Sequence, residues 1–98
     1  MDFKIIWSDP AIESLGNVVR HIAKDNPAAA LHMGQQLLGR VEVTSRFPEV
    51  GPVYRQAGPL AIRYLNEGDY RVYHRVQPTS QSIEILAVRH GAQQQPKF

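Results

Sequence analysis

The fold is decided by the stretch YRVYHRV at residues 70–76. It predicts a β-strand, because aromatic and β-branched residues dominate and neither Gly nor Pro interrupts them. Side chains alternate between the two faces of a strand, so Arg71, Tyr73 and Arg75 are expected on one face. Two arginines beside a tyrosine suit a phosphate, a carboxylate or an acidic partner better than they suit a core.

Two more strands are predicted around this one, at residues 60–65 and 82–89, with the central strand spanning 69–76. The turns between them are short, at residues 66–68 and 77–81, so the three strands are expected to form an antiparallel meander. In the last strand, the expected alternation places Ile83, Ile85 and Ala87 on one face and Glu84, Leu86 and Val88 on the other.

The N-terminal half predicts a strand at residues 3–7 followed by two helices. Ser8 or Asp9 can cap the first helix and Asn26 the second, and Pro10 and Pro27 suit their first turns. Apolar residues recur at helical spacing in both helices. They are Ile12, Leu15, Val18, Val19 and Ile22 in the first, and Ala30, Met33, Leu37, Leu38, Val41 and Thr44 in the second.

The remaining segments predict no regular structure. Pro and Gly at residues 47–52 indicate a loop, a connector is expected to continue to about Pro59, and residues 91–98 are expected to be a loose tail. The whole chain is therefore predicted as one α+β domain, with an N-terminal edge strand and a helical hairpin packed on one face of the sheet. The arginines of residues 70–76 belong on the open face or its rim, and Arg63 can reach the same side, depending on register.

Composition limits the possible functions. The chain has 98 residues, 43% hydrophobic residues and a formal net charge of +2. Cysteine is absent, which excludes disulfides and thiolate metal sites, and the sequence shows neither a secretory signal nor a membrane-spanning apolar run, so a cytoplasmic protein is expected. Residues 59–98 carry five basic and three acidic side chains, so the positive surplus lies in the predicted sheet and suggests an anionic partner.

The order of several short motifs resembles the RelE/ParE superfamily of toxins from type II toxin–antitoxin systems. These motifs are WS and PA at residues 7–8 and 10–11, NPAAA at 26–30, FPEVG at 47–51, YRV at 70–72 and ILAVRHGA at 85–92. The resemblance covers nearly the whole chain. The FPEVG loop and the HGA ending are closer to the ParE branch than to the RelE branch.

The resemblance implies a cognate antitoxin partner, encoded beside the toxin, whose C-terminal segment wraps the toxin. The ParE branch is associated with DNA gyrase inhibition and with plasmid stabilisation, and it has generally lost nuclease residues, whereas the RelE branch cleaves mRNA on the ribosome. ParE-like chains usually carry Arg directly after the HGA segment, and this chain has Gln93 there. That change could weaken toxicity, alter the target or be neutral.

The preferred interpretation is a ParE-like toxin that inhibits DNA gyrase by binding, with no cofactor. Candidate target- or antitoxin-binding residues are Arg63, Arg71, Tyr73, Arg75, Arg89 and His90. The first alternative is a ribosome-dependent mRNA endoribonuclease using Arg71 with His74 or His90. The second is a non-toxic antitoxin-binding protein that takes part in transcriptional autoregulation.

Structural roles are open for the same residues. Arg71 can pair with Glu67 or Asp69, His74 can be a sheet residue, and His90 can shape a turn. The lysine cluster of RNA-cleaving relatives is missing from the predicted sheet, since the chain has only Lys4, Lys24 and Lys97. His21 and Asp25 stand four residues apart on a helix, which is weak evidence for a metal site, and no metal is expected.

Overall fold

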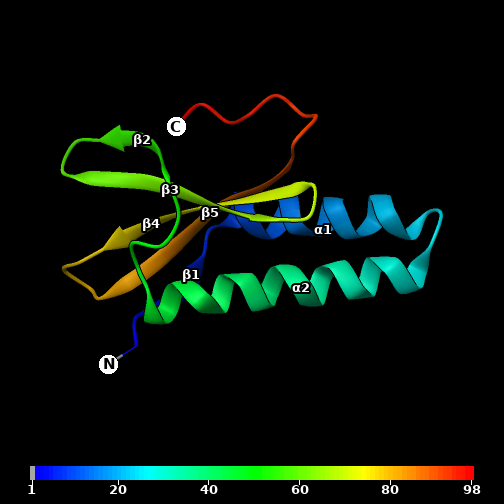
Figure 1. Ribbon diagram of the computed structural model, residues 1–98, viewed down its shortest axis with the longest axis horizontal. Helices are drawn as coiled ribbons and strands as arrows, with labels where there is room; N and C mark the ends of the chain where they lie inside the picture. The colour runs from blue at the N-terminus through cyan, green and yellow to red at the C-terminus, as the bar shows by residue number, and fades with distance from the viewer. Residues whose placement is uncertain (1) are drawn as a thin grey trace.

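A computed structural model describes residues 2–98, except for the side chain of Ala57. The elements are β1 (Lys4–Trp7), α1 (Asp9–Ala23), α2 (Pro27–Arg46), β2 (Val53–Ala57), β3 (Leu60–Glu67), β4 (Tyr70–Gln77) and β5 (Ser82–His90). The strands form one sheet in the order β1-β5-β4-β3-β2, in which β1 runs parallel to β5 and all other neighbours are antiparallel. The predicted α+β arrangement, with an edge strand and a helical hairpin beside a meander, is confirmed (Figure 1).

The two helices begin where the sequence predicts. Ser8 caps α1 by accepting a hydrogen bond from the Ala11 amide at 3.1 Å, and Asn26 caps α2 by accepting one from the Ala29 amide at 3.0 Å. Each helix has a proline in its first turn, where the N–H that proline lacks would have no acceptor within the helix. Only residues 24–26 separate the helices, and α1 and α2 therefore pack as a hairpin.

The main core lies between the helical hairpin and one face of the sheet. Its fully buried members include Leu37 and Val41 from α2 and Val72, Ile83 and Ile85 from the sheet. Trp7 packs against the same cluster while remaining partly exposed. A second, smaller cluster covers the other face of the sheet, around Ile62, Tyr73 and Ala87. The sheet is therefore covered by apolar side chains on both faces, and only one of those faces carries the helices.

The connector expected between residue 52 and Pro59 is wrong, because residues Val53–Ala57 form strand β2. β2 pairs antiparallel with β3, and its register shifts between Val53 and Arg55. The dense Pro and Gly content of residues 47–52 hides this short strand in the sequence. Gly58 adopts a φ of +62° in the tight turn that joins the two strands.

The expected alternation along the last strand is wrong after Ile85. Tyr73 of β4 pairs with Ala87, whereas the next residue, His74, pairs with Ile85. Leu86 is therefore an extra residue, and such a bulge shifts the side chains that follow it to the opposite face. Val88 joins the core beneath the helices, and Ala87 joins Tyr73 on the other face.

Several apolar helix residues remain exposed. Ile12 is 56% exposed on α1, and Leu31 and Leu38 are 64% and 48% exposed on α2. Ile12 and Leu38 were expected in the buried stripes, so those stripes are narrower than the sequence predicts. Among the helices that the structure describes, neither has the length and apolar content needed to cross a bilayer.

Candidate functional site

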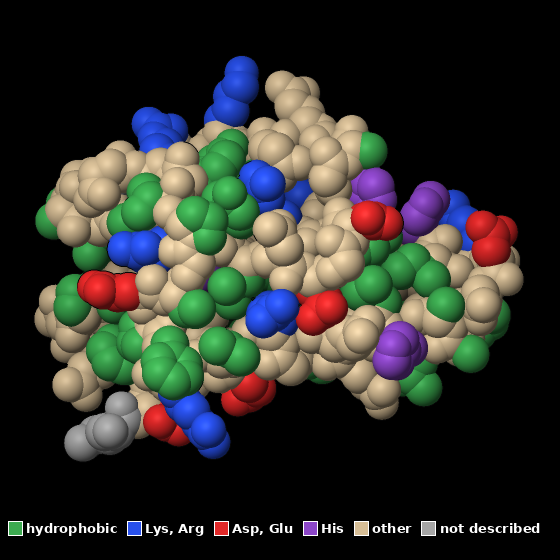
Figure 2. Space-filling model, in the orientation of Figure 1, with side chains coloured by type: hydrophobic (Ala, Val, Ile, Leu, Met, Phe, Trp, Pro, Cys, Tyr) green, Lys and Arg blue, Asp and Glu red, His purple; other side chains and the backbone are tan. Residues whose placement is uncertain are grey.

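The face of β4 that points away from the helices carries Arg71, Tyr73 and Arg75, as the alternation predicts. The register places Tyr64 of β3 opposite Tyr73, and Ala87 of β5 on its other side. Hydrophobic and basic side chains also lie next to one another over the sheet half of the molecule in the space-filling view (Figure 2).

Aromatic rings form the floor of this face. The rings of Tyr54 and Tyr73 meet edge to face with centroids 4.7 Å apart, and Tyr64 lies 6.1 Å from Tyr73. Phe98, the last residue, lies 5.4 Å from Tyr73 and 6.0 Å from Tyr54. We call Tyr54, Tyr64, Tyr73 and Phe98 the aromatic platform. Edge-to-face pairs at these distances stabilise one another beyond the area they bury.

Arg71 lies on the aromatic platform. Its guanidinium carbon is 3.9 Å from the centroid of the Tyr64 ring, and its Nη1 donates a long hydrogen bond of 3.4 Å to the Tyr73 hydroxyl. The expected pairing with Glu67 or Asp69 is absent, since no ion pair to Arg71 forms within residues 2–98. A cation held over a ring keeps its charge available, because the π-face attracts it without neutralising it.

Two arginines face each other next to the platform. Arg71 of β4 is directly opposite Arg89 of β5. Like charges at opposed positions on neighbouring strands repel each other and destabilise the sheet. An anionic partner bound here would relieve that repulsion.

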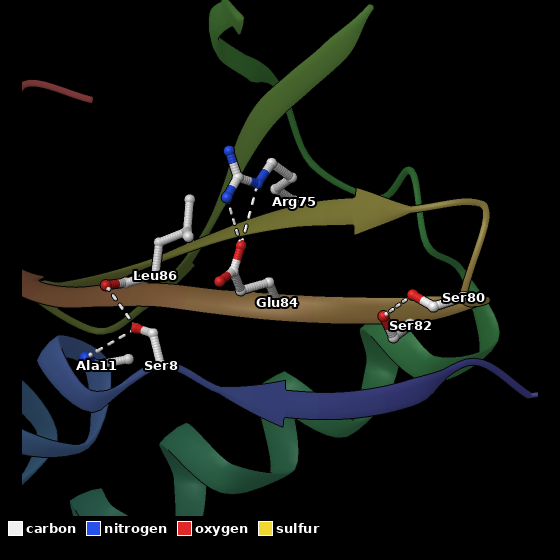
Figure 3. A network of polar contacts seen from close by, with 7 residues as sticks. All are labelled: Ser8, Ala11, Arg75, Ser80, Ser82, Glu84 and Leu86. Carbon is white, nitrogen blue, oxygen red and sulfur yellow. Dashed lines mark hydrogen bonds and ion pairs between the residues drawn. The ribbon is translucent and has the colours of Figure 1, made fainter.

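Arg75 is paired within the chain. Its Nε and Nη2 donate to one carboxylate oxygen of Glu84 at 3.1 and 2.5 Å (Figure 3). Figure 3 also shows this pair on the side of the sheet away from the helices. Because Glu84 neutralises its charge, Arg75 is a weaker candidate for anion binding than Arg71.

Arg63 does not reach the open face. Its Cα pairs with that of His74, and its Nη1 donates to the Gly51 carbonyl at 2.9 Å. The register, which the sequence left open, therefore places Arg63 on the opposite side of the sheet from Arg71. Arg63 instead holds the loop before β2 against β3.

His74 is fully buried on the face opposite Arg71. Its Nε2 lies 3.0 Å from the Val50 carbonyl, which can only accept, so Nε2 carries the proton of the neutral ring. Burial lowers the pKa of His74 and the positive charge of Arg63 lowers it further, while the Val50 hydrogen bond acts in the opposite direction. The ring is thus a neutral structural group that solvent does not reach.

His90 shapes the turn after β5. Its Nδ1 accepts a hydrogen bond from the Ala92 amide at 2.9 Å, and its ring meets the Tyr70 ring edge to face at 5.1 Å. Its backbone amide donates to the Gln93 side-chain oxygen at 2.8 Å. An arginine at position 93 has no acceptor and could not make that contact. Arg89 and His90 both line a hollow between α1 and β5.

The C-terminal residues return over the aromatic platform. Residues 91–98, expected as a loose tail, form no helix or strand, but Gln95, Pro96 and Phe98 are partly buried and Phe98 packs on the smaller apolar cluster. The Tyr54 hydroxyl donates to the Pro96 carbonyl at 2.6 Å, and the Tyr73 hydroxyl donates to the Gln95 side-chain oxygen. In Figure 1 the tail, drawn in red, runs back toward β2. One part of the platform is therefore covered by the chain itself.

Comparison with known proteins identifies the family. A family model described as the ParE toxin of the type II toxin–antitoxin system, parDE, matches residues 5–95. The chain belongs to this family. No curated protein sequence matches this ParE-family chain.

Solved structures share the fold at low sequence identity. The chromosomal ParDE toxin–antitoxin system from P. aeruginosa matches with a TM-score of 0.72 and 20% identity, covering 90% of this chain and 95% of that one. The archaeal RelE–RelB complex from Pyrococcus horikoshii matches with a TM-score of 0.68 and 18% identity, covering 96% and 100%. The RelBE2 toxin–antitoxin complex from Mycobacterium tuberculosis matches with a TM-score of 0.59 and 22% identity, covering 92% of each chain.

Within residues 2–98, the open face of this ParE-family chain carries positive charge but no histidine beside Arg71. RNA cleavage needs a base for the 2′-hydroxyl and an acid for the leaving oxygen. His74 is on the opposite face, and the register pairs His90 with Tyr70, which belongs to the core beneath the helices and not to the open face. Burial raises the pKa of the Tyr73 hydroxyl, although Arg71 partly offsets that rise, so the phenol stays protonated at neutral pH. The geometry suits recognition of an anion.

Sequence reasoning missed most of the aromatic platform. Tyr54 lies in the strand that was expected to be a connector, and Phe98 lies in the expected loose tail. Tyr64 lies within the predicted strand, but its neighbour across the sheet depends on register. The available signal was the aromatic content itself, since tyrosines at 54, 64 and 73 lie on three successive strands. No group of three or more His, Asp or Glu side chains in the described part of the chain is arranged to hold a metal ion.

Proposed function

We propose that this toxin-family protein inhibits DNA gyrase by binding it and is neutralised by a cognate antitoxin. The observation that carries the proposal is the Arg71 guanidinium, held 3.9 Å above the Tyr64 ring without a carboxylate partner among residues 2–98. Arginines on aromatic supports are typical anchors of protein interfaces. The family match over residues 5–95 supports gyrase as the target, since the ParE branch is associated with it.

A binding mechanism is also favoured by what surrounds Arg71. Its guanidinium donates a hydrogen bond to the Tyr73 hydroxyl, and its neighbour across the sheet is Arg89. Neither group is a general base at neutral pH. The platform therefore provides a fixed positive charge beside flat apolar rings, which suits an acidic segment of a partner protein.

The antitoxin would cover the helical hairpin and part of the arginine-bearing face. Ile12, Leu31 and Leu38 expose about half or more of their surface on the two helices. Leu31 and Leu38 are seven residues apart and therefore lie on one face of α2, and a continuous exposed apolar face commonly marks a partner-binding surface. The similar structures from P. aeruginosa, Pyrococcus horikoshii and Mycobacterium tuberculosis are themselves toxin–antitoxin systems or complexes, which supports such a partner.

The test is a gyrase supercoiling assay with purified protein. We expect inhibition by the wild type and a loss of potency of roughly 10-fold or more in Arg71→Ala, the size expected for an interface anchor. Arg46→Ala is the matched control, because Arg46 is an exposed arginine in the last turn of α2, in the layer on the opposite side of the sheet. The Arg46→Ala substitution removes one positive charge, as Arg71→Ala does, and this variant should inhibit gyrase as strongly as the wild type.

Other outcomes would assign a different function. Cleavage of mRNA on ribosomes that disappears in Arg71→Ala, without any effect on gyrase, would establish a nuclease. Absence of both effects, together with normal growth on expression, would indicate a non-toxic antitoxin-binding protein. A pull-down with the protein encoded by the adjacent reading frame tests the partner separately. Unchanged affinity after Leu31→Asp and Leu38→Asp together would exclude the hairpin as its binding surface.

A further inference from the structure

A hollow of about 820 Å³ lies between α1 and the end of β5; none of the residues of the aromatic platform lines it, but Arg89, which pairs with Arg71 across the sheet, does. The last residue of β1, Trp7, pairs with Ile85 of β5. Beyond Ile85, no strand covers this edge of β5 among the described residues. α1 then runs beside that edge, and Ser14 of α1 accepts the Val88 amide at 2.9 Å. The hollow is bounded by α1, by β5 and by the turn after β5. Its volume is in the range of small-molecule sites.

The charged side chains of the hollow are mainly basic. Arg20 and Lys24 of α1 and Arg89 of β5 line it, against a single lining carboxylate, Glu13. The Arg20 guanidinium is positioned by a 2.6 Å hydrogen bond to the Asn17 side-chain oxygen. A concave surface with a surplus of one charge concentrates ligands of the opposite charge.

The Arg89 side chain makes no hydrogen bond or ion pair in the described part of the chain that would hold it away from the hollow. Its Nε is buried and has no hydrogen-bond partner within residues 2–98, and its guanidinium forms no ion pair there. A buried donor without an acceptor is costly, so such groups in native proteins usually meet a partner. Turning the side chain toward a bound anion would cost Arg89 no existing hydrogen bond.

The turn after β5 adds neutral donors. Because Nδ1 of His90 accepts the Ala92 amide, the neutral ring carries its proton on Nε2 and can donate there. The Gln93 side-chain oxygen accepts the His90 amide, which leaves its NH₂ group available as a donor. Donors thus come from α1, from β5 and from this turn.

We propose that this hollow binds a phosphate group. A phosphate presents several oxygens in different directions and can accept donors from three sides, whereas a carboxylate presents two oxygens in one plane. The phosphate can belong to a free nucleotide or to a nucleic-acid strand. The inference does not depend on gyrase inhibition, because its readout is phosphate binding and neither Arg71 nor the aromatic platform lines the hollow.

The proposal is tested by titrating the ¹⁵N-labelled full chain with pyrophosphate, followed by NMR. We expect saturable shifts at the amides of Arg89, His90 and Gln93. Lys24→Gln should weaken binding roughly 3- to 10-fold, since one charged hydrogen bond is lost. Gln93→Arg adds a cation at the rim and should strengthen it. Lys4→Gln is the control, because Lys4 is an exposed lysine on β1 outside the hollow.

ATP and a single-stranded oligodeoxynucleotide distinguish the two sources of phosphate. Tighter binding of ATP assigns a free nucleotide, and tighter binding of the oligodeoxynucleotide with strong salt dependence assigns a strand. Absence of saturable pyrophosphate shifts, or shifts confined to the amides of Tyr54, Tyr64 and Tyr73, would overturn the proposal. Binding of a polyglutamate peptide in the hollow without pyrophosphate binding would also overturn it and assign a carboxylate ligand.

Discussion

The chemistry of single residues depends here on which face of the sheet they occupy. Arg71 and His74 stand only three positions apart, yet Arg71 lies over a tyrosine ring at the surface and His74 is sealed in the interior. The alternation of side chains in β4 predicted this separation from the sequence. It could not predict that Glu84 neutralises Arg75, because that contact depends on the register between β4 and β5.

Burial of the neutral His74 ring makes stability depend on pH. Because its pKa is lowered in the folded state, the unfolded chain takes up the proton at a higher pH than the folded chain. The contribution of the neutral His74 ring to the free energy of unfolding is complete at pH values above 6.5, the ordinary pKa of histidine. It is lost as the pH falls below that value. Each unit of difference between the folded and unfolded pKa corresponds to about 1.4 kcal/mol.

We therefore expect the free energy of unfolding of the wild type to fall between pH 7 and pH 5 more steeply than that of His74→Gln. The glutamine amide can still donate to Val50, but it does not titrate. Urea denaturation at a series of pH values measures this slope. His32→Gln, at an exposed position of α2, should keep the wild-type slope. Parallel slopes for wild type and His74→Gln would refute the assignment.

At the scale of elements, two glycines have opposite requirements. Gly51 has a φ of +89°, and an added Cβ would lie 2.2 Å from the Tyr64 carbonyl oxygen. Gly39 lies inside α2, with no atom within 4 Å of an added Cβ. The first glycine is required by the close approach of the loop to β3, and the second has no such requirement.

Gly51→Ala should destabilise the fold by at least about 1–3 kcal/mol, because a left-handed conformation and a backbone overlap act together. Gly39→Ala should stabilise it by about 0.5–1 kcal/mol, because alanine loses less backbone entropy on entering a helix. Chemical denaturation of both variants measures the two changes. Equal effects of the same sign would contradict the described loop geometry.

The sequence predicted helices and strands well where local chemistry decides them. Pro10 and Pro27 with their preceding caps located both helix starts. The bulge at Leu86 and the pairing of β2 could not be predicted, because each depends on contacts with a neighbouring strand and not on local residues. The aromatic platform was missed for the same reason, since it joins β2, β3, β4 and the final residue.

At the scale of the whole molecule, the sheet and the helical hairpin are joined by hydroxyl groups as well as by the core. Ser8 donates to the Leu86 carbonyl at 3.4 Å (Figure 3), and Ser14 accepts the Val88 amide at 2.9 Å. These contacts continue the edge of β5 after β1 ends. α1 therefore takes the place of a strand at that edge.

Ser14→Ala should cost about 1–3 kcal/mol, because it leaves the Val88 amide without its partner. Amide hydrogen exchange should show faster exchange at Val88 than in the wild type. Ser80→Ala removes a hydroxyl from an exposed turn and should leave that amide unchanged. Unaltered protection of Val88 in Ser14→Ala would show that the hydroxyl does not hold this edge.

The position of Phe98 has a practical consequence for laboratory work. Its ring touches Tyr54 and Tyr73, and the Tyr73 hydroxyl accepts a hydrogen bond from Arg71, so a tag fused directly after Phe98 would start at the aromatic platform. An affinity tag at that end would crowd the guanidinium and could make an active preparation look inert. β1 borders the opposite edge of the sheet from β2, so a tag placed before it leaves the rings clear.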